Sequence, residues 1–109
     1  MGVETLTLPE VADALGLPLN RVHQLIRDGQ LVALRQDGVR RVPATLVQDG
    51  QVVKHLPGVI TLLRDAGYQD EEIVDWLHRE DDSLPGSPIQ ALRENRGTEV
   101  KRRAQAAGF

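Results

Sequence analysis

The chain has 109 residues, of which 40% are hydrophobic, and a formal net charge of −3 at pH 7. This length and composition suit a compact domain with enough apolar residues for a core, so we expect a folded chain. The sequence has no cysteine, which excludes disulfides, thiol catalysis and cysteine-based zinc sites. It also has no signal peptide and no apolar stretch of about 20 residues, so it predicts a soluble, cytoplasmic protein.

A first helix is predicted from residue 8. Thr7 and Glu10 have the spacing of a capping box, in which each side chain accepts a hydrogen bond from the other residue's backbone amide. Pro9 lies in the first turn, where no helical hydrogen bond is lost, and Gly16 is a natural stop. The apolar spacing i, i+3, i+4, i+7 then predicts a buried stripe of Leu8, Val11, Ala12 and Leu15.

A second helix is predicted over roughly residues 19–27, after the short turn Gly16-Leu17-Pro18. Its apolar stripe is Val22, Leu25 and Ile26. A helix held across a first helix by such a turn can enter a DNA major groove, which is about 12 Å wide. Arginine suits guanine there, asparagine and glutamine suit adenine, and histidine is open to either base. The candidate residues on the outward face are Asn20, Arg21, His23, Gln24 and Arg27.

A two-stranded hairpin is predicted next. Residues 31–34 have the pattern of a short strand, Asp37-Gly38 is a strong two-residue turn, and residues 39–42 form the returning strand. Three arginines cluster about this hairpin, where a wing would lie along phosphates or reach a minor groove: Arg35, Arg40 and Arg41.

The charge of the chain is polarised. Residues 19–43 contain five arginines and two aspartates, whereas residues 57–109 contain ten acidic and seven basic residues. This distribution favours a local nucleic-acid surface over a protein that coats DNA by bulk charge. The order of elements therefore predicts a mainly α protein with a small β-hairpin: a winged helix-turn-helix over residues 1–56, followed by a C-terminal helical part over residues 57–109 that packs on it.

The C-terminal part is predicted to be helical with one loop. A short helix over residues 44–47 and a turn over 48–51 lead to a buried helix that starts near Leu56 and stops at Gly67. A further helix starts near Asp70, with Trp76 expected in the core, and residues 81–88 form a loop. A short helical turn is expected from Pro88, and a last helix is expected to begin at a Thr98 cap. This last helix contains the basic run Lys101, Arg102 and Arg103. We interpret the run as a solvated face, with phosphate contact as the alternative.

Segments along nearly the whole chain resemble a small actinobacterial family of DNA-binding proteins. The resemblance is carried by residues 8–27, Gly29-Gln30-Leu31-Val32-Ala33, Gly50-Gln51-Val52-Val53-Lys54, Leu56-Pro57-Gly58, Gly67-Tyr68, Ile73, Trp76-Leu77 and Arg102-Arg103-Ala104-Gln105-Ala106. It implies a winged helix-turn-helix with a C-terminal helical part, and a substrate of a membrane-linked Ser/Thr protein kinase. The phosphoacceptor threonine of that family lies in a tail before the first helix; this chain starts only a few residues before that helix, so we expect the tail to be missing. Kinase control is then left open, with Thr5 and Thr7 as the nearby candidates.

Two other functions were weighed against DNA binding. The second half is similar, more weakly, to the C-terminal helical domain of a class of antitoxins, through Gly67-Tyr68, Trp76-Leu77 and residues 86–92. This implies the alternative of a protein-interaction module whose C-terminal helices bind a partner protein. An enzyme is not expected, because the three histidines are scattered and no HExxH, Gly-rich phosphate loop or nucleophile elbow is present. Asp75 and His78 lie three apart, which indicates a solvated pair rather than a metal site.

The resulting hypothesis is sequence-preferring binding of double-stranded DNA, with regulation of transcription, by a protein without cofactor or metal. The second helix would read bases in the major groove, and the wing arginines would hold the backbone. We expect a monomer rather than a homodimer, given the size of the chain and its modest apolar surface; no coiled-coil heptad is visible. The operator, the direction of regulation and any ligand are not readable from the sequence.

Overall fold

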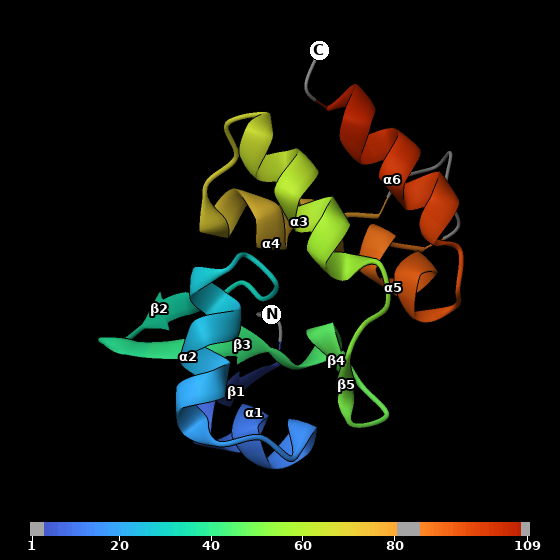
Figure 1. Ribbon diagram of the computed structural model, residues 1–109. Coiled ribbons are helices and arrows are strands. Elements are labelled where there is room, and N and C mark those ends of the chain that lie inside the picture. The colour runs from blue at the N-terminus through green and yellow to red at the C-terminus, as the bar shows by residue number, and fades with distance from the viewer. Residues whose placement is uncertain (1–3, 81–85, 108–109) are drawn as a thin grey trace.

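The computed structural model describes residues 4–80 and 86–107, in which six α-helices accompany two small antiparallel sheets (Figure 1). One continuous core of buried apolar side chains runs from α1 to α6. The fold is therefore the predicted one: mainly helical, with a winged helix-turn-helix followed by helices. In chain order the elements are β1 (Thr5–Thr7), α1 (Leu8–Leu15), α2 (Leu19–Arg27), β2 (Leu34–Gln36), β3 (Val39–Pro43), the 3-10 helix η1 (Ala44–Leu46), β4 (Val47–Gln48), β5 (Gln51–Val52), α3 (Leu56–Asp65), α4 (Asp70–His78), α5 (Pro88–Arg93) and α6 (Gly97–Ala106).

The predicted capping box of α1 is confirmed. The Thr7 amide donates to Glu10 Oε1 at 2.7 Å, and the Glu10 amide donates to Thr7 Oγ1 at 3.3 Å. Gly16 ends the helix with φ 67°, a left-handed conformation that glycine adopts without steric cost. Helix α1 therefore has both of its ends determined by local chemistry.

Replacing Thr7 with alanine should lower the free energy of unfolding by about 1 kcal/mol, the usual cost of losing an N-cap. Hydrogen bonds from the Thr7 amide and then the Thr7 hydroxyl, with a smaller effect of Arg41, lower the pKa of Glu10. A lowered carboxyl pKa stabilises the fold above its unfolded value of about 4.3, and this stabilisation is lost as pH falls through the folded value. Urea unfolding should thus show a cost at pH 7 that shrinks in acid, whereas T98A, which removes no cap, should be near neutral at both pH values.

A three-stranded sheet forms the base of the wing, in the order β1-β3-β2. Strand β1 was not predicted, and it pairs antiparallel with β3 in a register that puts Leu6 opposite Val42. The prediction of a strand over residues 31–34 is wrong, because β2 begins only at Leu34. Extending the β2–β3 register backwards would place Val32 opposite Pro43, which has no amide hydrogen to donate. The three residues before β2 instead leave the ladder and are buried in the core.

The segment after the wing follows the prediction closely. The 3-10 helix η1 occupies the place of the predicted short helix, and β4 and β5 form a two-residue hairpin around the predicted turn. Asp49 and Gly50 in that turn have φ of 53° and 77°. Such positive values at both central positions are those of the hairpin turn that an Asp-Gly pair favours.

The C-terminal helices start and stop largely where predicted. Helix α3 packs on α6 and α4 packs on α5, and Gly67 after α3 has φ 94°. The expected Thr98 cap is wrong: α6 begins at Gly97, where an added Cβ would lie 2.6 Å from the His55 ring. The His55 ring packs so close to Gly97 that this first residue of the helix has no room for a side chain, and Thr98 lies inside the helix. The expected core position of Trp76 is only partly met, because it is half-buried. Most of the predicted 81–88 loop lies outside the described residues.

A set of hydrogen bonds joins the two halves of the chain. The Arg93 side chain donates through Nη1 to the carbonyl oxygens of Thr45 at 2.8 Å and Val47 at 3.0 Å. His78 Nε2 lies 2.7 Å from Thr45 Oγ1, while His78 Nδ1 lies 2.8 Å from the Val74 carbonyl. Helices α4 and α5 are thereby held against the segment between β3 and β5.

Replacing Arg93 with alanine should lower the free energy of unfolding by about 2 kcal/mol, since hydrogen bonds to charged groups are worth about 1.5–3 kcal/mol. The loss of stability should be greatest where α5 contacts η1 and β4. Amide hydrogen exchange in these three elements should therefore become faster by a larger factor than in α1. R102A, on the exposed side of α6, is the matched control and should unfold at the wild-type urea concentration. Unchanged stability of R93A would show that the two carbonyls are satisfied as well by water.

Candidate nucleic-acid interface

Helix α2 presents a polar face to solvent. Val22 is fully buried, and because each helical residue turns by about 100°, the residues opposite Val22 are Asn20, Gln24 and Arg27. All three are exposed. Arg21, also exposed, and His23, half-buried, flank this face on its two sides. All five predicted base-reading residues therefore lie on one accessible side of the helix, and none is covered by the C-terminal helices.

Arg21 and Gln24 are coupled to each other. Arg21 Nη1 donates to Gln24 Oε1 at 2.9 Å, one turn further along α2. This bond limits the rotamers of both side chains, and both remain exposed. The pair thus presents donors and an amide group in a partly fixed arrangement, as bidentate contact with base edges requires.

The N-terminus of α2 has no side-chain cap. Pro18 occupies the N-cap position, which offers no side-chain acceptor to the first helical amides, and the first turn has no acidic residue. Helices α1 and α4 differ, because each has a capping box with a glutamate. The positive end of α2 is therefore not neutralised by the chain itself, which suits an approaching anion.

The wing divides its three arginines between two faces. Strand pairing puts Arg35 directly opposite Arg40, so both lie on one face of the hairpin, while Arg41 lies opposite Leu34 on the other. Arg41 donates through Nε to Thr5 Oγ1 at 2.8 Å and so binds β3 to β1. The cluster predicted from the sequence is thus a pair of arginines plus a third that is engaged within the sheet.

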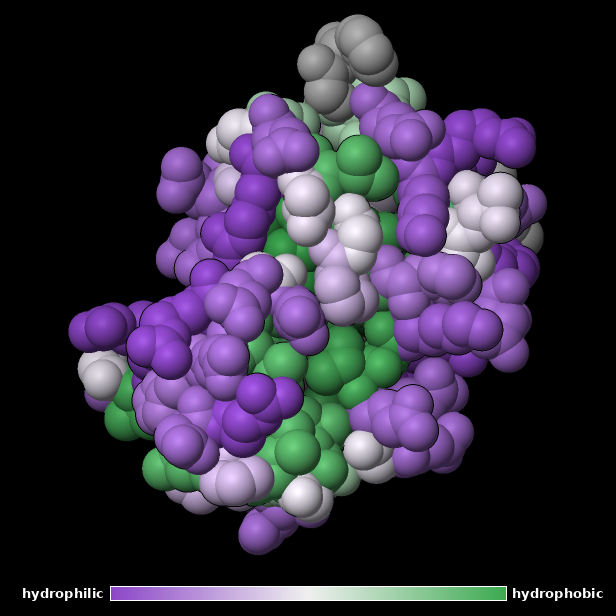
Figure 2. Space-filling view, in the orientation of Figure 1, coloured by the Kyte–Doolittle hydropathy of each residue, from purple (hydrophilic) through white to green (hydrophobic). Residues whose placement is uncertain are grey.

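Arg35 and Arg40 have no carboxylate partner among residues 4–80 and 86–107. Two like charges directly opposite each other destabilise a strand pair, and neither of these two is held in an ion pair with an acid of the described residues. An external anion would relieve the repulsion. Figure 2 shows that hydrophilic side chains predominate where α2 and the wing lie, with some hydrophobic surface among them.

A hollow between α2 and α3 brings cations and acids together. Its lining includes Arg27 and Arg40 as well as Arg64, which forms an ion pair with Asp70 at 2.9 Å. Asp28 and Asp65 also line it, as part of the full set Ile26, Arg27, Asp28, Gly29, Arg40, Thr61, Arg64, Asp65 and Asp70. The carboxylates balance the arginines, so this hollow is not a site for phosphate.

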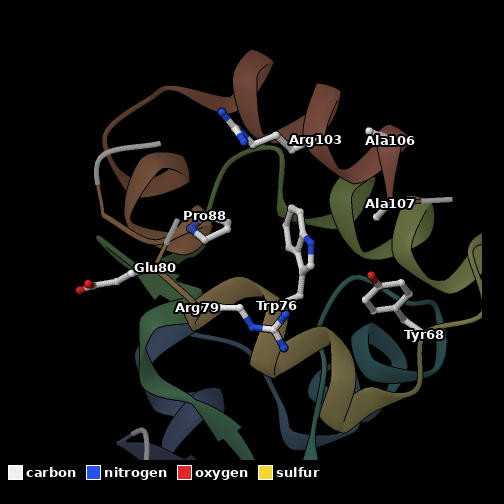
Figure 3. A pocket seen from close by; sticks show the side chains of 8 residues that line it. All are labelled: Tyr68, Trp76, Arg79, Glu80, Pro88, Arg103, Ala106 and Ala107. Carbon is white, nitrogen blue, oxygen red and sulfur yellow. The ribbon is translucent and has the colours of Figure 1, made fainter. Parts of the chain in front are cut away.

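A second hollow, of about 390 Å³, lies in the C-terminal part between α4, α5 and α6 (Figure 3). The rings of Trp76 and Tyr68 line it from the side of α4, and the α6 side chains lie across from them. The sequence placed Trp76 in the core, and its apolar spacing gave no sign of this hollow. The lining residues are Tyr68, Trp76, Arg79, Glu80, Pro88, Arg103, Ala106 and Ala107.

Residues 4–80 and 86–107 bring no three of His, Cys, Asp and Glu together in a metal-binding group. Within the same ranges, each helix is too short or too polar to cross a bilayer.

Two protein-family models match the chain end to end. Residues 1–53 match the model described as "DNA-binding protein Rv2175c, wHTH domain", and residues 53–108 match the "Rv2175c C-terminal domain of unknown function". The first match coincides with the two helices and wing described above, and the second with the helices from α3 onward.

Individual proteins agree with these family matches. The chain is 43% identical over 118 residues to the DNA-binding protein Rv2175c of Mycobacterium tuberculosis strain H37Rv, covering 96% of this chain and 81% of that protein. An excisionase of Streptomyces ambofaciens is 44% identical over 46 residues, covering 42% of this chain and 74% of the excisionase. The solved NMR structure of Rv2175c superimposes with a TM-score of 0.88 at 41% identity, over 98% of this chain and 82% of that one.

Proposed function

The chain belongs to the Rv2175c family of winged helix-turn-helix proteins, and from this premise we propose that it binds double-stranded DNA and catalyses no reaction. The observation that carries the proposal is the exposed polar face of α2 beside an arginine pair on the wing. Arg40 lines two hollows together with residues of α2, one with Arg27 and the other with His23. The wing and α2 therefore lie next to each other on one surface. A duplex could contact both at once.

The geometry supports a division of roles. Asn20, Arg21, His23, Gln24 and Arg27 would lie in the major groove, since α2 fits a groove about 12 Å wide. Arg35 and Arg40 would contact the phosphate backbone beside that groove, which positions the helix without reading sequence. Arg41 would contribute indirectly, because its Nε already holds Thr5 and keeps β1 on the sheet.

Regulation of transcription by a cytoplasmic monomer is the finer part of the proposal. A single α2 supplies few base contacts, so a monomer would bind a single half-site with modest affinity. Light scattering of the protein alone measures its oligomeric state. Light scattering with a short duplex measures the number of protein chains bound per duplex. One protein per duplex of about ten base pairs is expected; a dimer that binds two half-sites one helical turn apart would contradict it.

Fluorescence titration of a labelled random duplex at two salt concentrations tests the main proposal. Phosphate contacts release counterions, so affinity should fall by about 0.9 log unit per contact for each tenfold increase in salt. A random duplex should bind in the micromolar range or weaker at physiological salt, and a duplex selected from a random pool should bind more tightly. Absence of any salt-dependent duplex affinity would refute DNA binding.

Control by a Ser/Thr protein kinase is the remaining implication of the family resemblance. Both threonines near α1 already have structural roles, because Thr7 caps the helix and Thr5 accepts a hydrogen bond from Arg41. Phosphorylating either would break that bond and place the phosphate near Glu10 or Arg41. We therefore propose that modification of either threonine changes the stability of β1 and α1.

Binding of a partner protein by residues 57–109 is the second candidate function. The hollow around Trp76 and Tyr68 favours it, because half-buried aromatic rings beside charged side chains are typical anchor sites at interfaces. A pull-down from the host's lysate with wild type and W76A, followed by identification and titration of any captured protein, tests it. If wild type captures a protein that W76A does not, while W76A still binds duplex, the chain has both functions. Equal capture by wild type and W76A would count against this hollow as the binding site.

A further inference from the structure

Two large apolar side chains of the described residues are exposed, and both line the same hollow. Leu19, the first residue of α2, is 43% exposed, and Val39, the first residue of β3, is 50% exposed. With Pro9 from α1 they border a hollow of about 320 Å³ between the starts of the two helices and the wing. The complete lining is Thr7, Leu8, Pro9, Leu19, His23, Val39 and Arg40.

The hollow lies inside the surface proposed to face DNA. Leu19 and His23 are four residues apart on α2, so they share the side of the helix that faces the wing, next to Asn20 and Gln24. Arg40 adjoins the apolar residues from β3, with Arg35 opposite it. If the edge of one base contacts Asn20 or Gln24, the adjacent base would therefore lie against Leu19.

The charge around this hollow suits a polyanion. Its lining contains Arg40 and His23 and no carboxylate, unlike the hollow between α2 and α3, which Asp28, Asp65 and Asp70 line. Scattered exposed apolar residues are ordinary, but convergence of Leu19 and Val39 on one hollow within a cationic surface calls for an apolar group carried by an anionic partner.

We propose that this hollow receives the C5-methyl group of thymine. This inference rests on the proposed DNA binding and adds to it the base that Leu19 and Val39 recognise. The thymine methyl is the apolar group that a base pair exposes in the major groove, and aliphatic side chains contact it there. Arg40 would neutralise the phosphate flanking that thymine, so the apolar and cationic parts of the hollow act on one nucleotide.

Replacing thymine with deoxyuridine tests the inference, because it removes the methyl group and keeps the base pair. A duplex is first selected from a random pool with the wild-type protein, and each thymine is then changed singly while Kd is measured by fluorescence anisotropy. One or two positions should lose about fourfold in affinity, which corresponds to about 0.8 kcal/mol for one buried carbon. L19A should lose a similar factor on the thymine duplex and no longer distinguish thymine from deoxyuridine at those positions, whereas L19M should keep the distinction.

V39A gives a second, independent variant. Both side chains are only about half buried, so the melting temperatures of L19A and V39A should lie close to that of wild type; if one variant unfolds, the other carries the test. Equal weakening of L19A on thymine and deoxyuridine duplexes would mean that Leu19 touches deoxyribose, and would overturn the inference. So would a selected duplex that shows no deoxyuridine effect at any position while its binding remains salt-dependent, which leaves DNA binding itself intact. Absence of duplex affinity would overturn both proposals together.

Discussion

Replacing Arg35 and Arg40 together with alanine is expected to weaken binding to every duplex on the order of 100-fold. Each would lose hydrogen bonds to a charged phosphate, worth about 1.5 kcal/mol or more, and two such losses amount to about two decades in Kd. The slope of log K against log salt should fall by about 2, because about 0.9 counterion is released per phosphate contact. Selected and random duplexes should be affected alike, since phosphates carry no sequence.

The double variant should also unfold at a higher urea concentration than wild type. Arg35 and Arg40 lie opposite each other and neither forms an ion pair with an acid of the described residues, so removing both relieves a repulsion within the wing. Weaker binding by a more stable protein separates a lost contact from a damaged fold. The matched control is K101A/R102A, which removes the same charge from α6 and should leave the salt slope unchanged. A double wing variant that binds as wild type would place the backbone contact elsewhere.

Replacing Arg21 with alanine is expected to act on one base position. A bidentate arginine contact to guanine is worth about 1–3 kcal/mol of discrimination, up to roughly 150-fold in Kd on the selected duplex. The random duplex should lose far less, so the ratio of specific to random affinity should collapse. Titration of R21A against the selected duplex and its single-base variants should then show one position at which all four base pairs bind alike.

The bond between Arg21 and Gln24 makes their effects interdependent. Alanine at either residue frees the other, so the two single changes should not add, and a double-mutant cycle should show coupling of about 0.5 kcal/mol or more. R21K, which keeps the charge without the planar fork, should bind the random duplex as wild type but the selected duplex weakly. Equal losses of R21A on selected and random DNA would assign Arg21 to a phosphate instead of a base.

Local sequence chemistry predicted most of the fold. The Thr7 and Glu10 cap, the Gly16 stop and the Asp37-Gly38 turn each depend on residues that are neighbours in the chain, and all three are present. The periodic apolar stripe of α2 likewise identified its polar face, because helical geometry alone sets which residues share a side.

Features that depend on distant partners were missed. Strand β1 exists because β3 lies beside it, and residues 31–33 leave the ladder for the core. The glycine at the start of α6 packs against the His55 ring, which is far away in the chain. The hollow of Leu19 and Val39 likewise combines residues of α1, α2 and β3, so no single segment revealed it.

By itself, the sequence determined both ends of α1, which side of α2 is polar and that arginines gather about a hairpin, since caps, turns and periodicity act over a few residues. Only the tertiary structure decided that Arg35 and Arg40 share a face while Arg41 is bound to Thr5, and that Leu19 meets Val39. The reason is that strand pairing and packing bring together side chains whose separation along the chain carries no information about their distance in space.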